Sequence, residues 1–330
     1  MKTILLSILL FTPFLAFAGI SGSPTDSIAA NPGKTRYFIF GLDLGNNFSY
    51  MNHTDQNTYP YIYPNFLYKA ASGFYINTGA YGIKNVSTDY GISPWVEWDM
   101  GTGWKFKLND NNRFGLGYGY SAYNRSFPLL ASALSNNITA SYTHNFSWID
   151  AHATFDYAFG QLGGDSVLST KTVTNKKGKT RKKVVEKPTF FSSHDVFVNL
   201  DLSHEFDWDD VLKKDDEVSF DPGVTICLGT NNFYNNYAKR IKLAKKLGKK
   251  VSQTEADTNS TVSGTDAAAA AFMIREYILS LPLSYSYGRF DITAEYTYTI
   301  PVNQPTDPDF KVNPYSLFKI SLSYMIRKKD

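Results

Sequence analysis

Apolar and polar residues alternate without interruption over twelve residues near the C-terminus, from Arg289 to Ile300. Even-numbered positions are apolar or aromatic, and odd-numbered positions are charged or hydroxylated. A period of two predicts a β-strand, because successive strand side chains point to opposite faces. Half-buried strands of soluble proteins are usually about half this long, whereas a tilted strand that crosses a bilayer needs roughly 9–11 residues. The alternation returns between Phe318 and Ile326, and the pattern predicts a transmembrane β-barrel.

Alternation and turn residues together predict twelve strands along the chain. They lie near residues 36–50, 60–70, 73–83, 93–108, 113–124, 137–147, 149–161, 190–207, 217–232, 273–287, 289–301 and 315–327. The fold class expected is therefore all-β, a closed antiparallel transmembrane barrel of about twelve strands. Closure is required because unpaired strand edges cannot be hydrated in hydrocarbon, so the first strand should pair with the last.

Short and long connections alternate along the chain. This alternation is typical of bacterial outer-membrane barrels, which have short periplasmic turns and longer outer loops. An even strand count also returns both termini to the periplasm. The eighth connection, Trp208 to Asp216, is the exception, because it is about as long as the first and third connections.

The two faces of each strand differ in polarity, and the apolar face is expected to contact lipid. It carries Phe38, Phe40, Leu42, Leu44, Val96, Trp98, Met100, Trp104, Phe106, Ala151, Ala153, Phe155, Tyr157, Phe159, Val196, Val198, Leu200 and Leu202. The opposite face is polar and supplies the candidates for lining a lumen. These are Asp43, Glu97, Asp99, Lys105, Asp156, Asp201, Asp291, Glu295 and Lys319, with Lys69, Lys107, His152, Asn199, Glu205 and Asp221 on the same face.

Carboxylates outnumber lysines on this inner face, and two interpretations follow. Rings of Asp and Glu favour cations, so the face can line a cation-favouring pore. Alternatively, the acids and lysines form a plug of ion pairs and hydrogen bonds, because an unpaired charge is costly where water is absent. Two interpretations also apply to Gly115, Gly117 and Gly119. These glycines leave room in the lumen, or they relieve strain where the barrel wall curves.

Composition supports export to a membrane. Aromatic residues make up 16% of the chain, which fits aromatic girdles at both membrane interfaces. Lys2, an apolar run from Ile4 to Phe17 and Ala16-Phe17-Ala18 predict a signal peptide over residues 1–18. A periplasmic segment over 19–35 and the barrel over 36–330 are expected to follow. Cys227 is the single cysteine, so no disulfide or cysteine metal cluster is expected, and no metal or cofactor is predicted.

Basic residues are concentrated in two runs, within expected long outer loops near 162–189 and 233–272. Residues 171–187 hold 8 basic residues and 1 acidic residue, and residues 239–250 hold 7 basic residues and no acid. The candidates are Lys176, Lys177, Arg181, Lys182, Lys183, Lys239, Arg240, Lys245 and Lys246. The first run resembles a hairpin that extends beyond the membrane, and the second a basic amphipathic helix. Contact with outer-membrane lipid, lipopolysaccharide or acidic polymers is one interpretation, and a solvated loop is the other. Nucleic acid is not an expected partner, and no protein partner can be named.

An enzyme is not expected. Ser192, Ser193, His194 and Asp195 lie together at the outer end of a strand, but adjacent strand residues point to opposite faces. A nucleophile, base and orienting acid would therefore have to come from different strands.

Three segments resemble the uncharacterised outer-membrane barrels of Bacteroidetes-type bacteria: 63–75, the Asp221-Pro222-Gly223-Val224 stretch with Gly229, and the basic ending 318–330. The resemblance implies the barrel fold and a bacterial outer-membrane location, and carries over no functional residues. We expect a passive channel or transport-related barrel for small hydrophilic solutes. The alternative is a non-conducting structural or interaction barrel whose basic outer loops contact envelope polymers or partner proteins.

Overall fold

The structure, a computed structural model, describes residues 35–47, 60–83, 95–123, 134–174, 180–232, 271–304 and 313–329. For Val96, residues 161–174 and 180–192, and Lys329 it describes the backbone alone. Its strands are β1 (Thr35–Gly45), β2 (Tyr61–Lys69), β3 (Phe74–Ile83), β4 (Trp95–Lys107), β5 (Asn112–Tyr123), β6 (Asn136–Asn145), β7 (Asp150–Thr174), β8 (Thr180–Ser203), β9 (Phe206–Asp209), β10 (Asp216–Phe220), β11 (Gly223–Gly229), β12 (Met273–Tyr287), β13 (Phe290–Pro301) and β14 (Tyr315–Lys329).

The fourteen labelled segments form a closed barrel of twelve strands. Two of these strands are interrupted, so each carries two labels. β9 continues β8 after His204 and Glu205, and β10 continues into β11 across Asp221 and Pro222. β10 and β11 both pair with β12, at Leu283–Tyr287 and Met273–Ser280 respectively. Pro222 has no N–H to donate to the ladder, which explains the interruption there. β1 pairs antiparallel with β14 and β8 with β11, so the predicted closure and strand count are confirmed.

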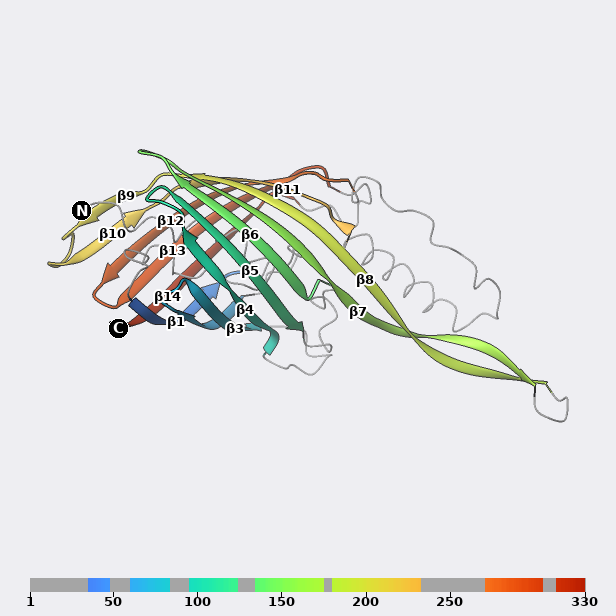
Figure 1. The fold of residues 1–330 in the computed structure, drawn as a ribbon. Coiled ribbons are helices and arrows are strands. Elements are labelled where there is room, and N and C mark those ends of the chain that lie inside the picture. Colours follow the sequence, from blue (N-terminus) through green and yellow to red (C-terminus); the bar gives the residue numbers. More distant parts are fainter. Residues whose placement is uncertain are drawn as a thin grey trace.

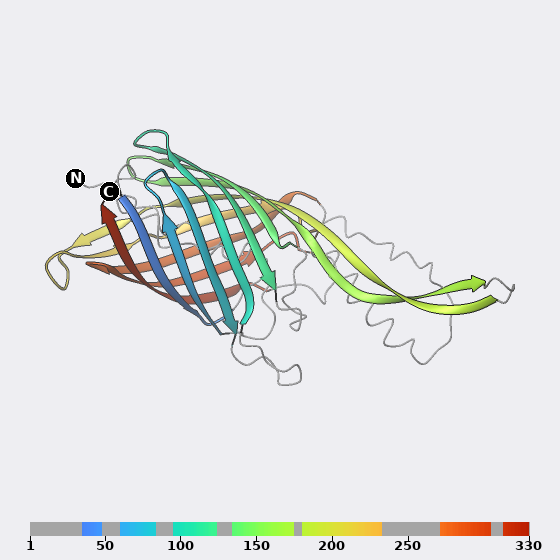
Figure 2. The ribbon, with the colours of Figure 1, turned by 60° about the horizontal axis from the view of Figure 1, so that its bottom comes forward.

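Short turns gather at one end of the barrel, together with both ends of the described chain (Figures 1 and 2). Thr35 is opposite Lys329, and β2–β3, β4–β5, β6–β7 and β12–β13 turn back within a few residues at this end. Gly73 and Gly288 adopt positive φ angles of 86° and 64° in two of these turns. Residues 210–215 also form a tight turn between β9 and β10, so the eighth connection follows the alternation after all.

The outer surface is apolar and the inner surface polar. Large apolar side chains are exposed on every side of the barrel, among them Phe40, Trp98, Met100, Trp104, Phe155, Leu200, Leu202 and Ile292. Residues one position away on the same strands, including Asp99, Asp156, Asp201 and Glu295, are buried. A water-soluble barrel has the opposite arrangement, so the predicted orientation of the strands is confirmed.

No helix among the described residues is both long and apolar enough to span a membrane.

The expected outer connection near 162–189 is a long two-stranded ribbon, in agreement with the hairpin predicted for its basic run. β7 and β8 pair from Asp150 and Ser203 as far as Thr174 and Thr180, with one register shift between Gly163 and Ser166. The ribbon continues well beyond the rest of the barrel (Figures 1 and 2). The β-branched residues between the basic residues favour this extended backbone. The expected signal peptide and nearly all of the loop expected near 233–272 lie outside the described residues.

Candidate functional site

The candidate site is the inner wall of the barrel. Its buried polar residues include ten acids: Asp43, Glu97, Asp99, Asp150, Asp156, Asp195, Asp201, Asp221, Glu276 and Glu295. In the part of the chain that the structure describes, Lys69 is the single buried lysine or arginine, and His152 is also buried. The wall therefore carries a marked excess of carboxyl groups.

Strand register holds several of these carboxyl groups in place, because they face a hydrogen-bond donor on a neighbouring strand. Asp99 on β4 is opposite Ser121 on β5, whose Oγ donates to the Asp99 carboxyl at 2.7 Å. Asp201 on β8 is opposite both Thr225 and His152. The Thr225 hydroxyl donates to Asp201, and His152 Nδ1 lies 3.1 Å from its other oxygen.

Asp156 and Asp195 also accept hydrogen bonds from donors on neighbouring segments of the wall. The Asp156 carboxyl accepts hydrogen bonds from Thr139, its register partner, and from Asn137. The Asp195 carboxyl accepts from the Thr230 hydroxyl at 2.7 Å and from the Asn232 backbone N–H at 2.6 Å. Cross-strand donors thus fix the position of the acids on a rigid sheet.

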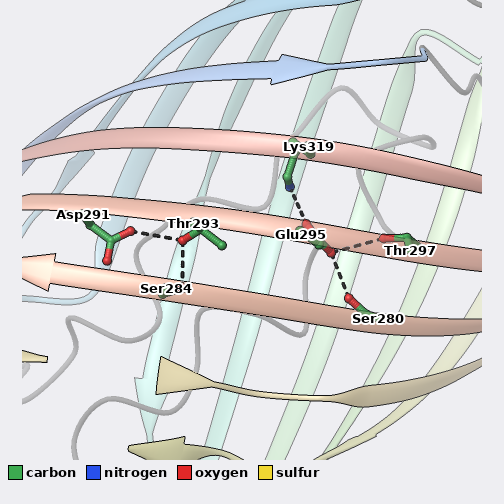
Figure 3. A network of polar contacts seen from close by, with 7 residues as sticks. All are labelled: Ser280, Ser284, Asp291, Thr293, Glu295, Thr297 and Lys319. Atoms are coloured by element: carbon green, nitrogen blue, oxygen red, sulfur yellow. Dashed lines mark hydrogen bonds and ion pairs between the residues drawn. The ribbon is translucent and has the colours of Figure 1, made fainter. Parts of the chain in front are cut away.

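One lysine is built into the acidic wall. Lys319 on β14 is opposite Glu295 on β13, and its Nζ lies 2.9 Å from Glu295 Oε2. Glu295 also accepts hydrogen bonds from Ser280 at 2.9 Å and Thr297 at 3.4 Å (Figure 3). Asp43 on β1 interacts electrostatically with the same lysine. Lys319 therefore lies between two carboxyl groups from different strands.

Further along the same wall, Asp291, Thr293 and Ser284 form a second polar group (Figure 3). Asp291 accepts from Ser286 at 2.6 Å and from Thr293 at 3.3 Å, and Thr293 is hydrogen bonded to Ser284 at 2.8 Å. All four side chains come from β12 and β13, whose register places Asp291 opposite Ser286 and Thr293 opposite Ser284. These hydrogen bonds therefore also follow from the register between neighbouring strands.

Tyrosines contribute to the inner wall, and the sequence analysis did not name them as site residues. Tyr63 on β2 stacks on Tyr81 on β3 with ring centroids 4.1 Å apart, and Tyr61 meets Tyr81 at 5.5 Å. Tyr63 is also hydrogen bonded to Asp99. Their positions have the same parity as Lys69 and Asn65 on β2, so the period of two could have identified them. Glu276 lies on the inner face of β12 and was also not named, although the same period of two could have identified it.

Aromatic and amide side chains fill the space above the inner glycines. A Cβ at Gly117 would lie 2.7 Å from the Tyr75 hydroxyl, and one at Gly79 would lie 2.3 Å from the Tyr63 ring. At Gly115 the Ser141 hydroxyl would be 2.4 Å away. Glycine therefore allows neighbouring side chains to lie flat on the wall, and these positions do not add open space to the lumen.

The remaining lumen candidates are spread along the barrel. Lys105 is partly buried, with its Nζ 6.0 Å from the centroid of the Tyr75 ring. Lys107, expected on the inner face, is exposed near the β4–β5 turn and forms an ion pair with Asp110 at 2.7 Å. The hydrogen bond and charge of Lys107 lower the pKa of Asp110. Lys107 therefore lies at the end of the barrel that carries the short turns, which we call the short-turn rim.

Of the basic candidates, Arg181, Lys182 and Lys183 lie on β8 in the ribbon, where the backbone alone is described. Lys176, Lys177, Lys239, Arg240, Lys245 and Lys246 lie outside the described residues.

The residues considered for an enzyme do not converge. Ser193 and Asp195 are buried inside, whereas His194 is exposed on the outer face near Tyr157. The other His–Asp contact, His152 with Asp201, is joined by a threonine. No group of three or more His, Cys, Asp or Glu residues in the described ranges could hold a metal ion.

The architecture places the protein in a membrane. It combines complete closure, an even strand number, short turns at one end and an apolar outer face around a polar interior. The chain is a bacterial outer-membrane β-barrel. The Bacteroidetes affiliation stays a prediction.

No protein-family model and no curated protein matches the chain. Solved structures of similar fold include an outer-membrane channel from Pseudomonas putida F1, with 9% identity and a TM-score of 0.44, which covers 92% of this chain and 99% of that one. The NanC porin has 7% identity and a TM-score of 0.42, with 86% and 98% covered. The KdgM porin has 7% identity and a TM-score of 0.41, with 87% and 98% covered. At these values the comparisons identify no solute for this chain.

Proposed function

We propose that the barrel is a passive channel for small hydrophilic solutes that favours cations over anions. The observation that carries this proposal is the inner wall, where ten buried acids accompany Lys69, His152 and the partly buried Lys105 and Lys319 among the described residues. The acids come from strands around the barrel rather than from one patch, as Asp43, Asp156, Asp201 and Glu276 illustrate.

Fixed carboxylates favour cation passage through their electrostatic field. A narrow passage with low-dielectric walls concentrates that field, so each charge acts more strongly there than on an open surface. The hydroxyl donors opposite Asp99, Asp156 and Asp201 hold these side chains at fixed positions on the wall.

A non-conducting barrel is the second candidate, and one observation favours it. Asp99 and Glu97 are 0% and 2% exposed, and Lys319 is paired with Glu295. Closely packed inner side chains of this kind support a structural or interaction role in which the interior is a polar core. The two candidates differ in one measurable property, the conductance.

Planar-bilayer recording of the purified, refolded barrel tests the proposal. The channel predicts discrete current steps and a reversal potential that indicates cation preference. The triple substitution Glu97→Gln, Asp99→Asn, Glu295→Gln should weaken that preference, and high salt should screen it.

A matched control removes the same number of carboxylates from the short-turn rim: Asp110→Asn, Asp210→Asn, Asp215→Asn. This variant should keep most of the preference, because its charges lie outside the passage. Silence across many refolded preparations, or an anion preference that the first triple does not change, would support the non-conducting barrel instead.

A further inference from the structure

The ribbon formed by the outer parts of β7 and β8 leaves the barrel wall. Pairing with β6 ends at Phe159 of β7, and pairing with β11 covers only Phe197–Ser203 of β8. Beyond these points the two strands pair with each other alone, within the part of the chain that the structure describes. The ribbon extends away from the end of the barrel opposite the short turns (Figures 1 and 2).

The register divides the ribbon into two faces of different charge. One face holds the pairs Val167–Lys187, Ser169–Val185, Lys171–Lys183 and Val173–Arg181. The other holds Leu168–Glu186, Thr170–Val184, Thr172–Lys182 and Thr174–Thr180. The first, which we name the basic face, has four cations and no acid. The second has one cation and one acid, so its formal charge is zero.

The basic face contains a directly opposed pair of like charges, Lys171 and Lys183. Like charges directly opposite each other destabilise a strand pair. A two-stranded ribbon without a covering layer is itself marginally stable in water. A polyanion on the basic face would offset both effects, because its charges would bridge the opposed cations.

Distance along the ribbon indicates what kind of anion fits. β7 leaves the barrel wall after Phe159, so the distance is counted from Gly160. Residues 167–173 lie seven to thirteen positions beyond it, or roughly 20 to 45 Å at the rise of a strand. The headgroup region adds only about 5 to 8 Å to each side of the hydrocarbon core. The basic face therefore extends past the phosphates at the membrane surface, where a soluble or surface-bound polymer can be reached.

We propose that the basic face of the β7–β8 ribbon binds an acidic polysaccharide outside the membrane. The face supplies a row of cations along one side of an extended ribbon, which matches the repeating charges of a polyuronate chain. Binding is mainly electrostatic, so it weakens with ionic strength.

The test measures binding of a fluorescently labelled alginate oligomer to the whole barrel in detergent micelles, by fluorescence anisotropy. The variant Lys171→Gln, Lys183→Gln should bind roughly 25-fold more weakly at low salt, since it removes two cations and each contributes roughly a factor of five near an anionic partner. A barrel in which 164–189 is replaced by Asn-Gly should lose binding, and neutral dextran should not bind.

Arg36 and Lys328 provide the matched control, because they form another directly opposed pair of cations, at the short-turn end. The variant Arg36→Gln, Lys328→Gln removes the same charge and should bind alginate normally. Heat-modifiable electrophoretic migration checks that every variant is folded. Equal loss in both double variants, no loss in either, or binding to vesicles of anionic phospholipid but not to alginate would overturn the proposal.

Discussion

Lys319 and Glu295 form an ion pair inside the barrel, with 2.9 Å between Nζ and Oε2 and side-chain exposures of 12% and 3%. They are direct register partners on β14 and β13, near the seam where β14 meets β1. A buried pair of this kind contributes little beyond a well-packed apolar pair, but the removal of one partner leaves an uncompensated charge.

The substitution Lys319→Met should therefore destabilise the barrel by about 3–5 kcal/mol. The double variant Lys319→Met, Glu295→Gln should recover part of that loss, because it removes the Glu295 charge and leaves only Asp43 without the lysine. Urea unfolding in lipid vesicles, followed by tryptophan fluorescence, measures both effects. Additive losses in the double variant would show that the two residues do not interact.

Leu200 and Leu212 provide a matched test of the membrane boundary. Leu200 is 44% exposed on the outer face, midway along β8/β9 between His194 and Phe206, whereas Leu212 is 73% exposed in the turn between β9 and β10. Leu200→Arg should destabilise the inserted barrel by about 2–4 kcal/mol, because its charge would enter the hydrocarbon. Leu212→Arg should cost about 0–1 kcal/mol in the same unfolding measurement. Similar costs would mean that Leu200 does not face lipid.

Asp216 organises the β9–β10 turn. Its carboxyl accepts backbone N–H hydrogen bonds from Val211 at 2.7 Å, Leu212 at 3.0 Å and Lys213 at 2.7 Å. Asp216→Ala should loosen residues 210–215 and increase the rate of proteolytic cleavage there severalfold, because these N–H groups lose their acceptor.

Asp215→Ala is not a suitable control for this turn, since Asp215 has a positive φ of 66° that a β-carbon without a polar group tolerates poorly. Asp215→Asn is better, because asparagine accepts that conformation. The control should be cleaved at the wild-type rate. Equal cleavage of both variants would remove the role assigned to Asp216.

The β7–β8 ribbon should be dispensable for folding. Replacement of residues 164–189 by Asn-Gly joins Gly163 to Phe190, which are already opposite each other, through a turn suited to a hairpin. The pairs from Asp150–Ser203 to Gly163–Phe190 stay in place, so heat-modifiable migration on gels should be retained. Its loss would mean that the ribbon takes part in barrel assembly.

The strands could be predicted from sequence because each one crosses from water through lipid to water. An inner side chain and a lipid-facing side chain must then alternate, as in Phe290–Ile300, and the period of two is visible within the strand itself. The same rule could have located Tyr63 and Glu276 on the inner face. The ribbon was predicted as a hairpin from its β-branched residues, but its length along β7 and β8 is a matter of pairing that the alternation does not show.

The sequence by itself located the twelve barrel strands, the face of each strand that meets lipid, and the excess of carboxylates on the inner face. These are properties of single strands, set by the alternation of side chains and the demand of hydrocarbon for apolar contacts. Only the tertiary structure decided which groups meet: Lys319 with Glu295, Ser121 with Asp99, and Tyr63 over Gly79. Those contacts depend on the register between strands, and a shift of register would pair each acid with a different neighbour without changing the pattern along the chain.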